Sequence, residues 1–377
     1  MTAERALGVY VHWPYCARIC PYCDFNIYKN REIDEAHWKT ALTRDLRHWA
    51  ERTKGRKLTS LYFGGGTPSL APLGVIEAVI DACERLWGFE PDTEITIEAN
   101  PTDAEQSRFE AFARAGVNRL SLGVQSLRDD ALKFLGRDHD AASAKRAIET
   151  AQRIFKRTTF DLIYARPGQS LDAWRAELGE ALDLGASHLS LYQLTIEPGT
   201  AFAKAVAAGR WAPLSADECA DQFDLAQEMT AAAGLPAYEV SNHAAPGDQS
   251  RHNLIYWRYH DYVGVGPGAH GRLTIDGRRL AAEAPKAPEN YLAAGPDAWI
   301  IEDLDEEAQL VERLTMGLRL TEGVTLYADD YFYADETRAD RLQALIADGL
   351  LRHDCGRLSA TPDGRRVLNA VLYELLR

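Results

Sequence analysis

Short apolar runs alternate with longer amphipathic stretches through about the first two thirds of this 377-residue chain. The runs have the length and composition of strands and occupy residues 7–12, 58–63, 94–99, 117–124, 158–164 and 187–194. Helical patterns lie between them, for example in residues 35–54 and 172–185. A strand–helix–strand order implies a parallel sheet with right-handed crossovers. Six such units are too few for a closed eight-fold barrel, so we predict an α/β fold that forms an open, partial (β/α)6 TIM-like barrel.

The alternation ends near residue 200, and the rest of the chain divides into two parts. Residues 240–275 are rich in Gly and His and look irregular, and Ile275-Asp276-Gly277-Arg278 is typical of a hairpin turn. Beyond residue 303, a helical pattern, a short hairpin and a last helix follow in the order of a winged helix. We therefore predict a barrel over residues 1–240, an irregular connecting segment over 241–302, and a mostly helical, winged-helix-like domain over 303–377.

The charge and the hydropathy of the chain exclude two broad classes of protein. A net charge of −14 argues against binding of nucleic acid through a basic surface. No apolar stretch approaches the length of a membrane span, and the opening residues lack the apolar core of a signal peptide. We expect a cytoplasmic protein with no membrane span and no nucleic-acid partner.

Three of the six cysteines, Cys16, Cys20 and Cys23, fall within eight residues. Structural disulfides are rare in the reducing cytosol, so metal binding or thiol reactivity is favoured over pairing. Three thiolates fill only three corners of a zinc site, whereas a [4Fe–4S] cluster on three cysteines keeps one iron without a protein ligand. The spacing favours the cluster and leaves zinc or redox-active thiols as alternatives. The other cysteines are expected to be small buried hydrophobic residues: Cys83, Cys219 and Cys355.

Polar and glycine-bearing segments follow several of the predicted strands. They are Gly64-Gly-Gly-Thr-Pro68, Glu98-Ala-Asn-Pro101 and Gln125-Ser126. The glycine segment lacks the Lys-Ser/Thr of a phosphate-binding P-loop. Each segment taken singly also has a purely structural explanation, such as a tight turn or a solvated strand end. Because the carboxyl ends of barrel strands form the working face, we expect these segments and the cysteine loop to meet at one rim.

The spacing C-x3-C-x2-C, with an aromatic residue before the third cysteine, resembles the signature of the radical S-adenosylmethionine (SAM) superfamily. In that family SAM chelates the open iron, and an electron from the cluster cleaves SAM to methionine and a 5′-deoxyadenosyl radical. The resemblance implies a [4Fe–4S] cluster on Cys16, Cys20 and Cys23. It also implies a SAM site, carried over by motif position, at Tyr10, Tyr22, Gly65, Gly66, Thr67, Glu98, Gln125, Arg137 and Asp161.

The resemblance covers nearly the whole chain and is close to two groups of the superfamily. One is the oxygen-independent coproporphyrinogen III oxidase, which decarboxylates a porphyrin precursor, and the other is the haem chaperone group HemW. The oxidase type has a fourth cysteine where this chain has Phe25, and a long extension where this chain has nine residues before Tyr10. Tyr238-Glu-Val-Ser-Asn242 followed by Arg251-His-Asn-Leu-Ile-Tyr-Trp257 resembles the H-N-x-x-Y-W hallmark of the chaperones. These features favour a chaperone that binds haem and delivers it to membrane-bound haem enzymes, with the oxidase as the alternative.

The H-N-x-x-Y-W stretch also suggests where haem binds. On a helix, His252 and Tyr256 lie one turn apart on one face. An imidazole is a good axial ligand for haem iron, and aromatic side chains can form the walls of a porphyrin site. The resemblance favours His252 as the ligand, with weaker candidates at His243, His260 and His270.

Other expectations follow from the resemblance. The haem-accepting enzymes would bring the protein to the membrane surface during delivery, and cleavage of SAM would require an electron donor. The choice between a monomer and a homodimer, and the turnover of SAM, stay open. One motif departs from the family: where the family usually reads Asp-Leu-Ile-Tyr-Gly-Leu-Pro-Gly, this chain has Ala165 and Arg166. A charged residue there could bind a ligand, gate the rim or face water.

Overall fold

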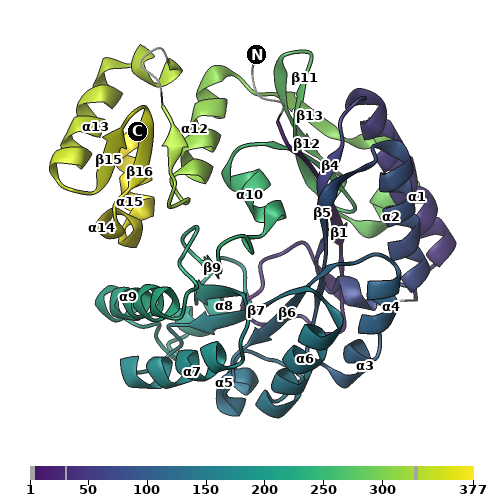
Figure 1. The fold of residues 1–377 in the computed structure, drawn as a ribbon, viewed down its shortest axis with the longest axis horizontal. Helices are drawn as coiled ribbons and strands as arrows, with labels where there is room; N and C mark the ends of the chain where they lie inside the picture. The colour runs from purple at the N-terminus through teal and green to yellow at the C-terminus, as the bar shows by residue number, and fades with distance from the viewer. Residues whose placement is uncertain (1–4, 30–31, 327–329) are drawn as a thin grey trace.

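The structure of the protein is a computed structural model that describes residues 5–29, 32–326 and 330–377 (Figure 1). Among these residues, eleven strands form one sheet. Across it they follow the order β13 (Ile300–Asp303), β12 (Arg278–Glu283), β11 (His270–Ile275), β10 (Asp261–Val265), β1 (Leu7–Trp13), β4 (Leu58–Gly65), β5 (Phe89–Ala99), β6 (Arg119–Gln125), β7 (Arg157–Tyr164), β8 (His188–Gln193) and β9 (Asn242–Ala244). The strands from β10 to β8 run parallel, and antiparallel strands extend both edges.

The two faces of the sheet differ because side chains alternate along each strand. In β5, Ile95 and Ile97 are buried in the main apolar core, while Glu94, Thr96 and Glu98 point to the opposite face. The same alternation runs through β1 and β4, so the outer face is apolar and the inner face is polar. A polar inner face in a partial barrel is available for binding and chemistry.

Helices cover the outer face of the barrel strands (Figure 1). In α1, Trp38, Leu42, Leu46 and Trp49 recur at helical spacing and are buried, which stabilises the fold by about 1.5–3 kcal/mol for each side chain. Asp34 caps this helix by accepting a hydrogen bond from the backbone N–H of His37. The helices of this part are α1 (Glu35–Arg52), α2 (Leu73–Leu86), α3 (Asp103–Gln106), α4 (Phe109–Arg114), α5 (Asp129–Phe134), α6 (Ala141–Ile154), α7 (Leu171–Asp183), α8 (Ala201–Ala207), α9 (Ala216–Ala232) and α11 (Pro288–Ala293).

The predicted partial barrel is confirmed, and its six predicted strands are β1 and β4 to β8. The expectation of irregular structure over residues 240–275 was wrong, because β10 in this segment is a further parallel strand paired with β1. Gly264 makes the strand hard to recognise in the sequence, because glycine has a low propensity for β-strands. A Cβ atom at Gly264 would meet the carbonyl oxygen of His270, so the close approach of β11 requires glycine there. The boundaries of the three predicted domains stay a prediction.

The C-terminal residues form a separate small core around a three-stranded sheet. Its elements are α12 (Glu306–Gly317), β14 (Val324–Thr325), α13 (Glu336–Ala347), β15 (Leu351–Asp354), β16 (Arg357–Ala360), α14 (Pro362–Arg366) and α15 (Leu368–Leu376). The predicted order of helix, hairpin and last helix is confirmed by α13, β15–β16 and α15. Arg319 links this unit to the barrel through an ion pair of 3.0 Å with the buried Glu239.

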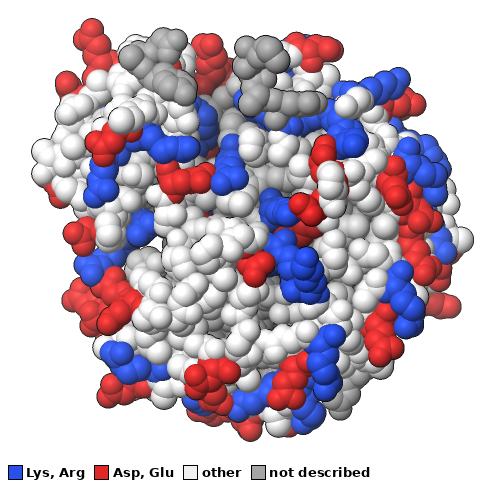
Figure 2. Space-filling model, viewed as in Figure 1, with Lys and Arg blue, Asp and Glu red and all other residues white. Residues whose placement is uncertain are grey.

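The helix α10 (Arg251–Trp257), which carries the H-N-x-x-Y-W motif, lies on the inner side of the sheet near β1, β4 and β10 (Figure 1). A Cβ atom at Gly8 of β1 would collide with Ile255 of α10, so this glycine admits the helix. On the outside of the molecule, acidic and basic side chains are interspersed over the face in Figure 2. Within the described residues, every helix is too short or too polar to cross a bilayer.

Candidate functional site

A cavity of about 410 Å³ lies at the carboxyl ends of the barrel strands. It joins the cysteine loop to the carboxyl-terminal parts of β4, β5, β6 and β8 with the segments that follow them, and to residues within β7. The predicted residues that line it are Cys16, Cys20, Tyr22, Cys23, Gly65, Gly66, Thr67, Glu98, Gln125, Arg137 and Asp161. Tyr10 and His252 do not line it. The cysteine loop and the strand-end segments thus lie around one cavity, as expected, whereas Tyr10, which was expected at the same rim, lies outside it. The roles of all these residues stay a prediction.

The three cysteines of the loop follow β1, and Cys16 ends the short strand β2 (Tyr15–Cys16), which pairs with β3 (Tyr28–Lys29). Burial raises the pKa of the Cys16 thiol, and it raises the pKa of the Cys23 thiol to about 11. Thiols whose pKa is raised are poor nucleophiles unless a metal ion stabilises the thiolate.

Within the described residues, no three His, Cys, Asp or Glu side chains stand close enough together to hold a single metal ion. Zinc and a [4Fe–4S] cluster place different demands on such cysteines, since tetrahedral zinc gathers its ligands around one atom. A [4Fe–4S] cube holds each cysteine on a different iron and so spaces the thiolates more widely.

Two side chains donate hydrogen bonds to sulfur atoms of the loop. The Thr67 hydroxyl donates to Cys16 Sγ at 3.5 Å, and Arg137 Nη1 donates to Cys20 Sγ at 3.2 Å. Arg137 Nε is buried and has no partner among the described residues. Donors directed at thiolate sulfur, with a guanidinium beside them, fit a cluster that carries negative charge.

The other three cysteines have different surroundings. Cys83 is buried and its pKa is raised by burial, as expected of a small hydrophobic residue. The expectation was wrong for Cys355, which is exposed in the turn between β15 and β16 at φ 50°. Cys219 is half-buried on α9.

Two acidic side chains approach the cavity from neighbouring parts of the inner face. Tyr62 donates to Glu98 Oε1 at 2.8 Å, and the Gly65 backbone N–H donates to Oε2 at 3.2 Å. Burial raises the pKa of Glu98 to about 7 and that of Asp161 to about 6. Both groups can therefore change protonation near neutral pH, which is common at functional sites.

The glycines after β4 have a structural cause as well as a place in the cavity. A Cβ atom at Gly65, whose φ is +105°, would lie 2.6 Å from the His12 ring. A Cβ atom at Gly66 would lie 2.7 Å from the Tyr15 carbonyl oxygen. The resemblance assigns Gly65 and Gly66 to the SAM site, and the structure adds that these glycines allow the close approach of β1 and β2. A larger residue at Gly65 would disturb His12 before it reached any ligand.

Gln125 is a non-glycine residue with a positive φ of 70°, at the point where the β6–β7 pairing shifts its register. This conformation costs roughly 1–3 kcal/mol and aims the end of β6 into the cavity. Strain of this kind is often found at binding sites.

Arg166 does not gate the rim or face water. It is 7% exposed, and its Nη2 lies 2.5 Å from Oε2 of Glu177 on α7, which is 0% exposed. Its Nη1 also donates to the Ile163 carbonyl at 2.7 Å. Ala165 beside it has a φ of 57°, which explains why the family usually has glycine at this position. The departure from the family pattern is therefore a buried ion pair behind the site.

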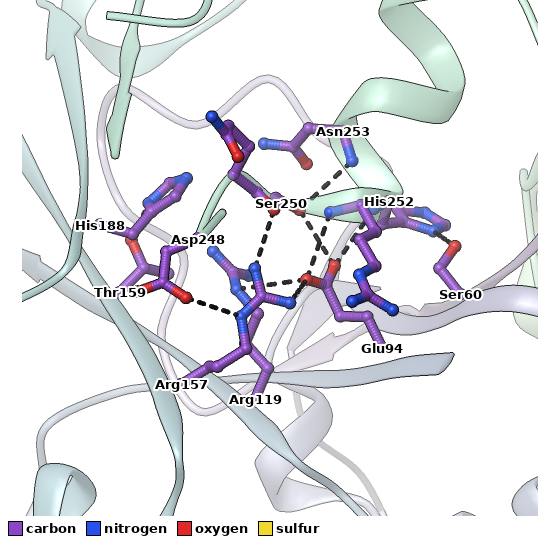
Figure 3. Close-up of polar contacts among 12 residues, drawn as sticks. Ser60, Glu94, Arg119, Arg157, Thr159, His188, Asp248, Ser250, His252 and Asn253 are labelled. Atoms are coloured by element: carbon purple, nitrogen blue, oxygen red, sulfur yellow. Dashed lines mark hydrogen bonds and ion pairs between the residues drawn. The ribbon is translucent and has the colours of Figure 1, made fainter. Parts of the chain in front are cut away.

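The position of His252 is set by a buried polar network on the inner face (Figure 3). Glu94 accepts hydrogen bonds from the backbone N–H of His252 at 3.1 Å and from Ser250 Oγ at 3.2 Å. Burial would raise the pKa of Glu94, but Arg119 and Arg157 hold it below its usual value. The ionised carboxylate thus anchors the first turn of α10 to β5.

Both ring nitrogens of His252 are hydrogen-bonded, and the side chain is 1% exposed. Nδ1 lies 2.7 Å from Ser60 Oγ, and Nε2 lies 2.6 Å from the Tyr256 hydroxyl. The His252 ring stacks on Tyr62 at 4.8 Å and on Tyr10 at 6.2 Å between centroids. Tyr10 and His252 therefore form one aromatic stack, which Tyr62 connects to Glu98 in the cavity.

Motif reasoning missed several residues of the cavity wall. Tyr192, Gln193 and Glu197 come from the end of β8 and the segment after it. The rule that led to the other strand ends would have found them too, because residues 187–194 were predicted as a strand. Asn100 lines the cavity as well, and its contacts are described below.

Comparisons with known proteins agree with this geometry. The sequence-family model of the Radical SAM superfamily matches residues 10–179, and the family model of the HemN C-terminal domain matches residues 304–367. The heme chaperone HemW of Escherichia coli is 37% identical over 97% of this chain and 97% of its own length. The mitochondrial radical S-adenosyl methionine domain-containing protein 1 of Bos taurus is 37% identical over 99% of this chain and 88% of its own length.

A solved structure shows the same fold. The coproporphyrinogen III oxidase (HemN) of Escherichia coli has a TM-score of 0.80, covers 99% of this chain and 90% of its own, and is 23% identical. At that identity the likeness supports the fold alone. The full-length relatives decide the family: the chain belongs to the radical SAM superfamily, in the group of the heme chaperone HemW.

Proposed function

We propose that the protein is a haem chaperone that carries a [4Fe–4S] cluster on Cys16, Cys20 and Cys23 and binds SAM in the adjoining cavity. The observation that carries this proposal is that one cavity brings the cysteine loop together with motif residues from four strands. The kinship with proteins named heme chaperones supports the haem part.

The residues of the loop fit the cluster. The thiolates would bind three irons, while Thr67 and Arg137 would keep their hydrogen bonds to sulfur. The bound cluster would supply one electron to SAM, and a reductant outside the chain would have to replace it. The raised pKa values of Cys16 and Cys23 imply that loading releases protons and becomes weaker at low pH.

The opposite wall of the cavity fits the polar parts of SAM. Glu98 and Asp161, when ionised, accept hydrogen bonds from ribose hydroxyls or from an ammonium group. Tyr22 offers an aromatic surface next to the cysteines, and the strained Gln125 presents an amide that can donate and accept. We propose these residues, with Gly65, Gly66, Thr67 and Arg137, as the SAM site. Tyr10 would act on it from outside, through the aromatic stack.

For haem, His252 stays the proposed ligand, with a condition that the structure imposes. Burial lowers the pKa of His252 to about 3, so the ring is neutral, as metal ligation requires. Its Nε2 must first give up the Tyr256 hydroxyl and become accessible. His243 is equally buried and bonded through Nδ1 to Thr230, whereas His270 is exposed. His270 is therefore the next residue to test.

The main experiment is anaerobic reconstitution followed by metal, sulfide and haem analysis. We expect about four irons and four sulfides per chain. Alanine variants of Cys16, Cys20 or Cys23 should lose the brown chromophore, and Cys219→Ala, the matched control, should keep it. One zinc per chain without colour would refute the cluster.

Haem addition to the reconstituted protein should give a Soret band that is weakened or shifted in His252→Ala. With coproporphyrinogen III, SAM and a reductant, we expect no decarboxylation; conversion would assign the protein to the oxidase type instead. Delivery of haem to membrane-bound enzymes, from a cytoplasmic location and with transient contact at the membrane, completes the proposal.

A further inference from the structure

Asn100 connects two of the motifs that reach the cysteine loop. It follows β5 in the segment Glu98-Ala-Asn-Pro101 and lines the cavity. Its Nδ2 donates to Thr67 Oγ1 at 3.3 Å, and its Oδ1 accepts from Arg137 Nη2. Thr67 and Arg137 are the two residues that donate to Cys16 and Cys20.

The chemistry of the neighbours fixes which way the Asn100 amide points. A guanidinium group has only donors, so the amide oxygen must face Arg137 and the amide nitrogen must face Thr67. Thr67 Oγ1 then accepts a hydrogen bond from Asn100, and its own proton is directed to Cys16 Sγ. On the other side, Asn100 and the Gly123 carbonyl hold Nη2 of Arg137, which leaves Nη1 to donate to Cys20.

Asn100 is itself held firmly. Its backbone N–H donates to Oε2 of Glu105 at 2.7 Å, and Glu105 is 3% exposed. Ser69 Oγ donates to the same carboxylate oxygen. The backbone of Asn100 is therefore fixed, which keeps its side-chain amide between Thr67 and Arg137. The hydrogen bonds from these two residues to sulfur depend on the position of that side-chain amide.

We propose that Asn100 is a positioning residue that directs hydrogen bonds to two of the three cluster cysteines and thereby raises the reduction potential of the cluster. The proposal rests on the proposed function, since it needs the cluster on these cysteines. Hydrogen bonds to cluster sulfurs favour the reduced state, because reduction adds negative charge to the sulfurs.

The test compares Asn100→Ala with a matched control at the other end of the same strands. Asn118 also makes two side-chain hydrogen bonds: it accepts from the Ile95 N–H at 2.9 Å and donates to the Thr93 carbonyl at 2.8 Å. Asn118→Ala therefore removes an equivalent pair of contacts away from the cysteine loop. The readouts are the iron and sulfide content and the midpoint potential, from an anaerobic titration followed by electron paramagnetic resonance.

Asn100→Ala should keep its iron and shift the midpoint potential to a more negative value, and Asn118→Ala should match the unmodified protein. Thr67→Val should shift the potential in the same direction, Thr67→Ser should restore it, and the Asn100→Ala/Thr67→Val pair should shift it by less than the sum.

Either of two results overturns the proposal. One is a fully loaded Asn100→Ala with an unchanged potential. The other is loss of iron from Asn100→Ala, which would show that Asn100 holds the loop instead of tuning the cluster. If the unmodified protein loads no iron, it is the proposed function that fails.

Discussion

Replacement of Arg166 by leucine, the residue that the family usually has there, should destabilise this chain by about 3 kcal/mol. The reason is Glu177, a fully buried carboxylate on α7 whose ion pair with Arg166 is its only one among the described residues. A buried ion pair adds little net stability as a pair, but removal of one partner leaves an uncompensated charge that costs about 3–5 kcal/mol.

The contacts that remain set the magnitude at the lower end of that range. Glu177 Oε1 would still accept from Ser126 Oγ at 2.5 Å and from the Leu127 N–H at 2.9 Å. Gln169 Nε2 stands 3.4 Å from Oε2. These neutral donors solvate the charge in part, because each net hydrogen bond is worth about 1 kcal/mol.

The assay is urea unfolding of the metal-free protein, with the slope of the transition checked for each variant. Arg128→Leu is the matched control, since Arg128 pairs with Glu180 one turn further along α7 and both side chains are about a third exposed, at 36% and 32%. That pair should be worth less than about 1 kcal/mol. Arg166→Leu combined with Glu177→Gln should recover most of the loss, because the second substitution removes the buried charge that would otherwise be left unpaired.

A loss below about 1 kcal/mol in Arg166→Leu, or no recovery in the double variant, would refute this account of the pair.

Three other substitutions have expected outcomes. Glu98→Gln should weaken SAM binding but stabilise the metal-free protein at pH 8 by up to about 3 kcal/mol. The pKa of Glu98 is raised to about 7, so its stabilising effect is complete below its unfolded pKa and is lost as pH rises through 7. Thermal unfolding should show the gain shrinking towards pH 5, and a gain that is constant with pH would contradict the assignment. Ala165→Gly should stabilise the chain by about 1 kcal/mol in urea unfolding, because φ there is 57°. Tyr256→Phe frees Nε2 of His252 and should tighten haem binding in a Soret titration, whereas unchanged affinity would place the ligand elsewhere.

The barrel could be predicted from the sequence because its information is local. Each strand carries its own apolar run and each helix its own periodicity, so β1 and β4 to β8 were evident without knowledge of their pairing. The strand β10 could not be found in this way. Its pairing with β1 joins residues about 250 positions apart, and Gly264, which the neighbouring strand requires, weakens the local signal.

The site also has residues that the sequence could assign and residues that it could not. Residues near the carboxyl ends of predicted strands or within them, such as Glu98 and Asp161, were assigned to the site by their motifs, and both line the cavity. The side chain of Tyr10 points to the same inner face but lies deeper, where it stacks on Tyr62 instead of lining the cavity. The partner of Arg166 could not be inferred, because Glu177 meets it only after α7 has packed. Sequence patterns indicate which edge of the sheet a residue reaches, and tertiary packing decides how deep it lies and what it contacts.

The inner face of the barrel therefore has two parts along the strands. We call the part at the carboxyl ends of the strands the upper level and the part nearer their amino ends the lower level. The upper level holds Glu98 and opens into the cavity, whereas the lower level holds Glu94, which anchors α10. The His252–Tyr62 stack spans the two levels, since Tyr62 donates to Glu98 while its ring lies on His252. A haem iron that took Nε2 of His252 would have to displace the Tyr256 hydroxyl and expose a ring that is now packed on Tyr62. Such a movement would disturb the hydrogen bond to Glu98. If haem binds at α10 and SAM in the cavity, as we propose, the two would therefore not bind independently, and by linkage each would change the affinity for the other by the same factor.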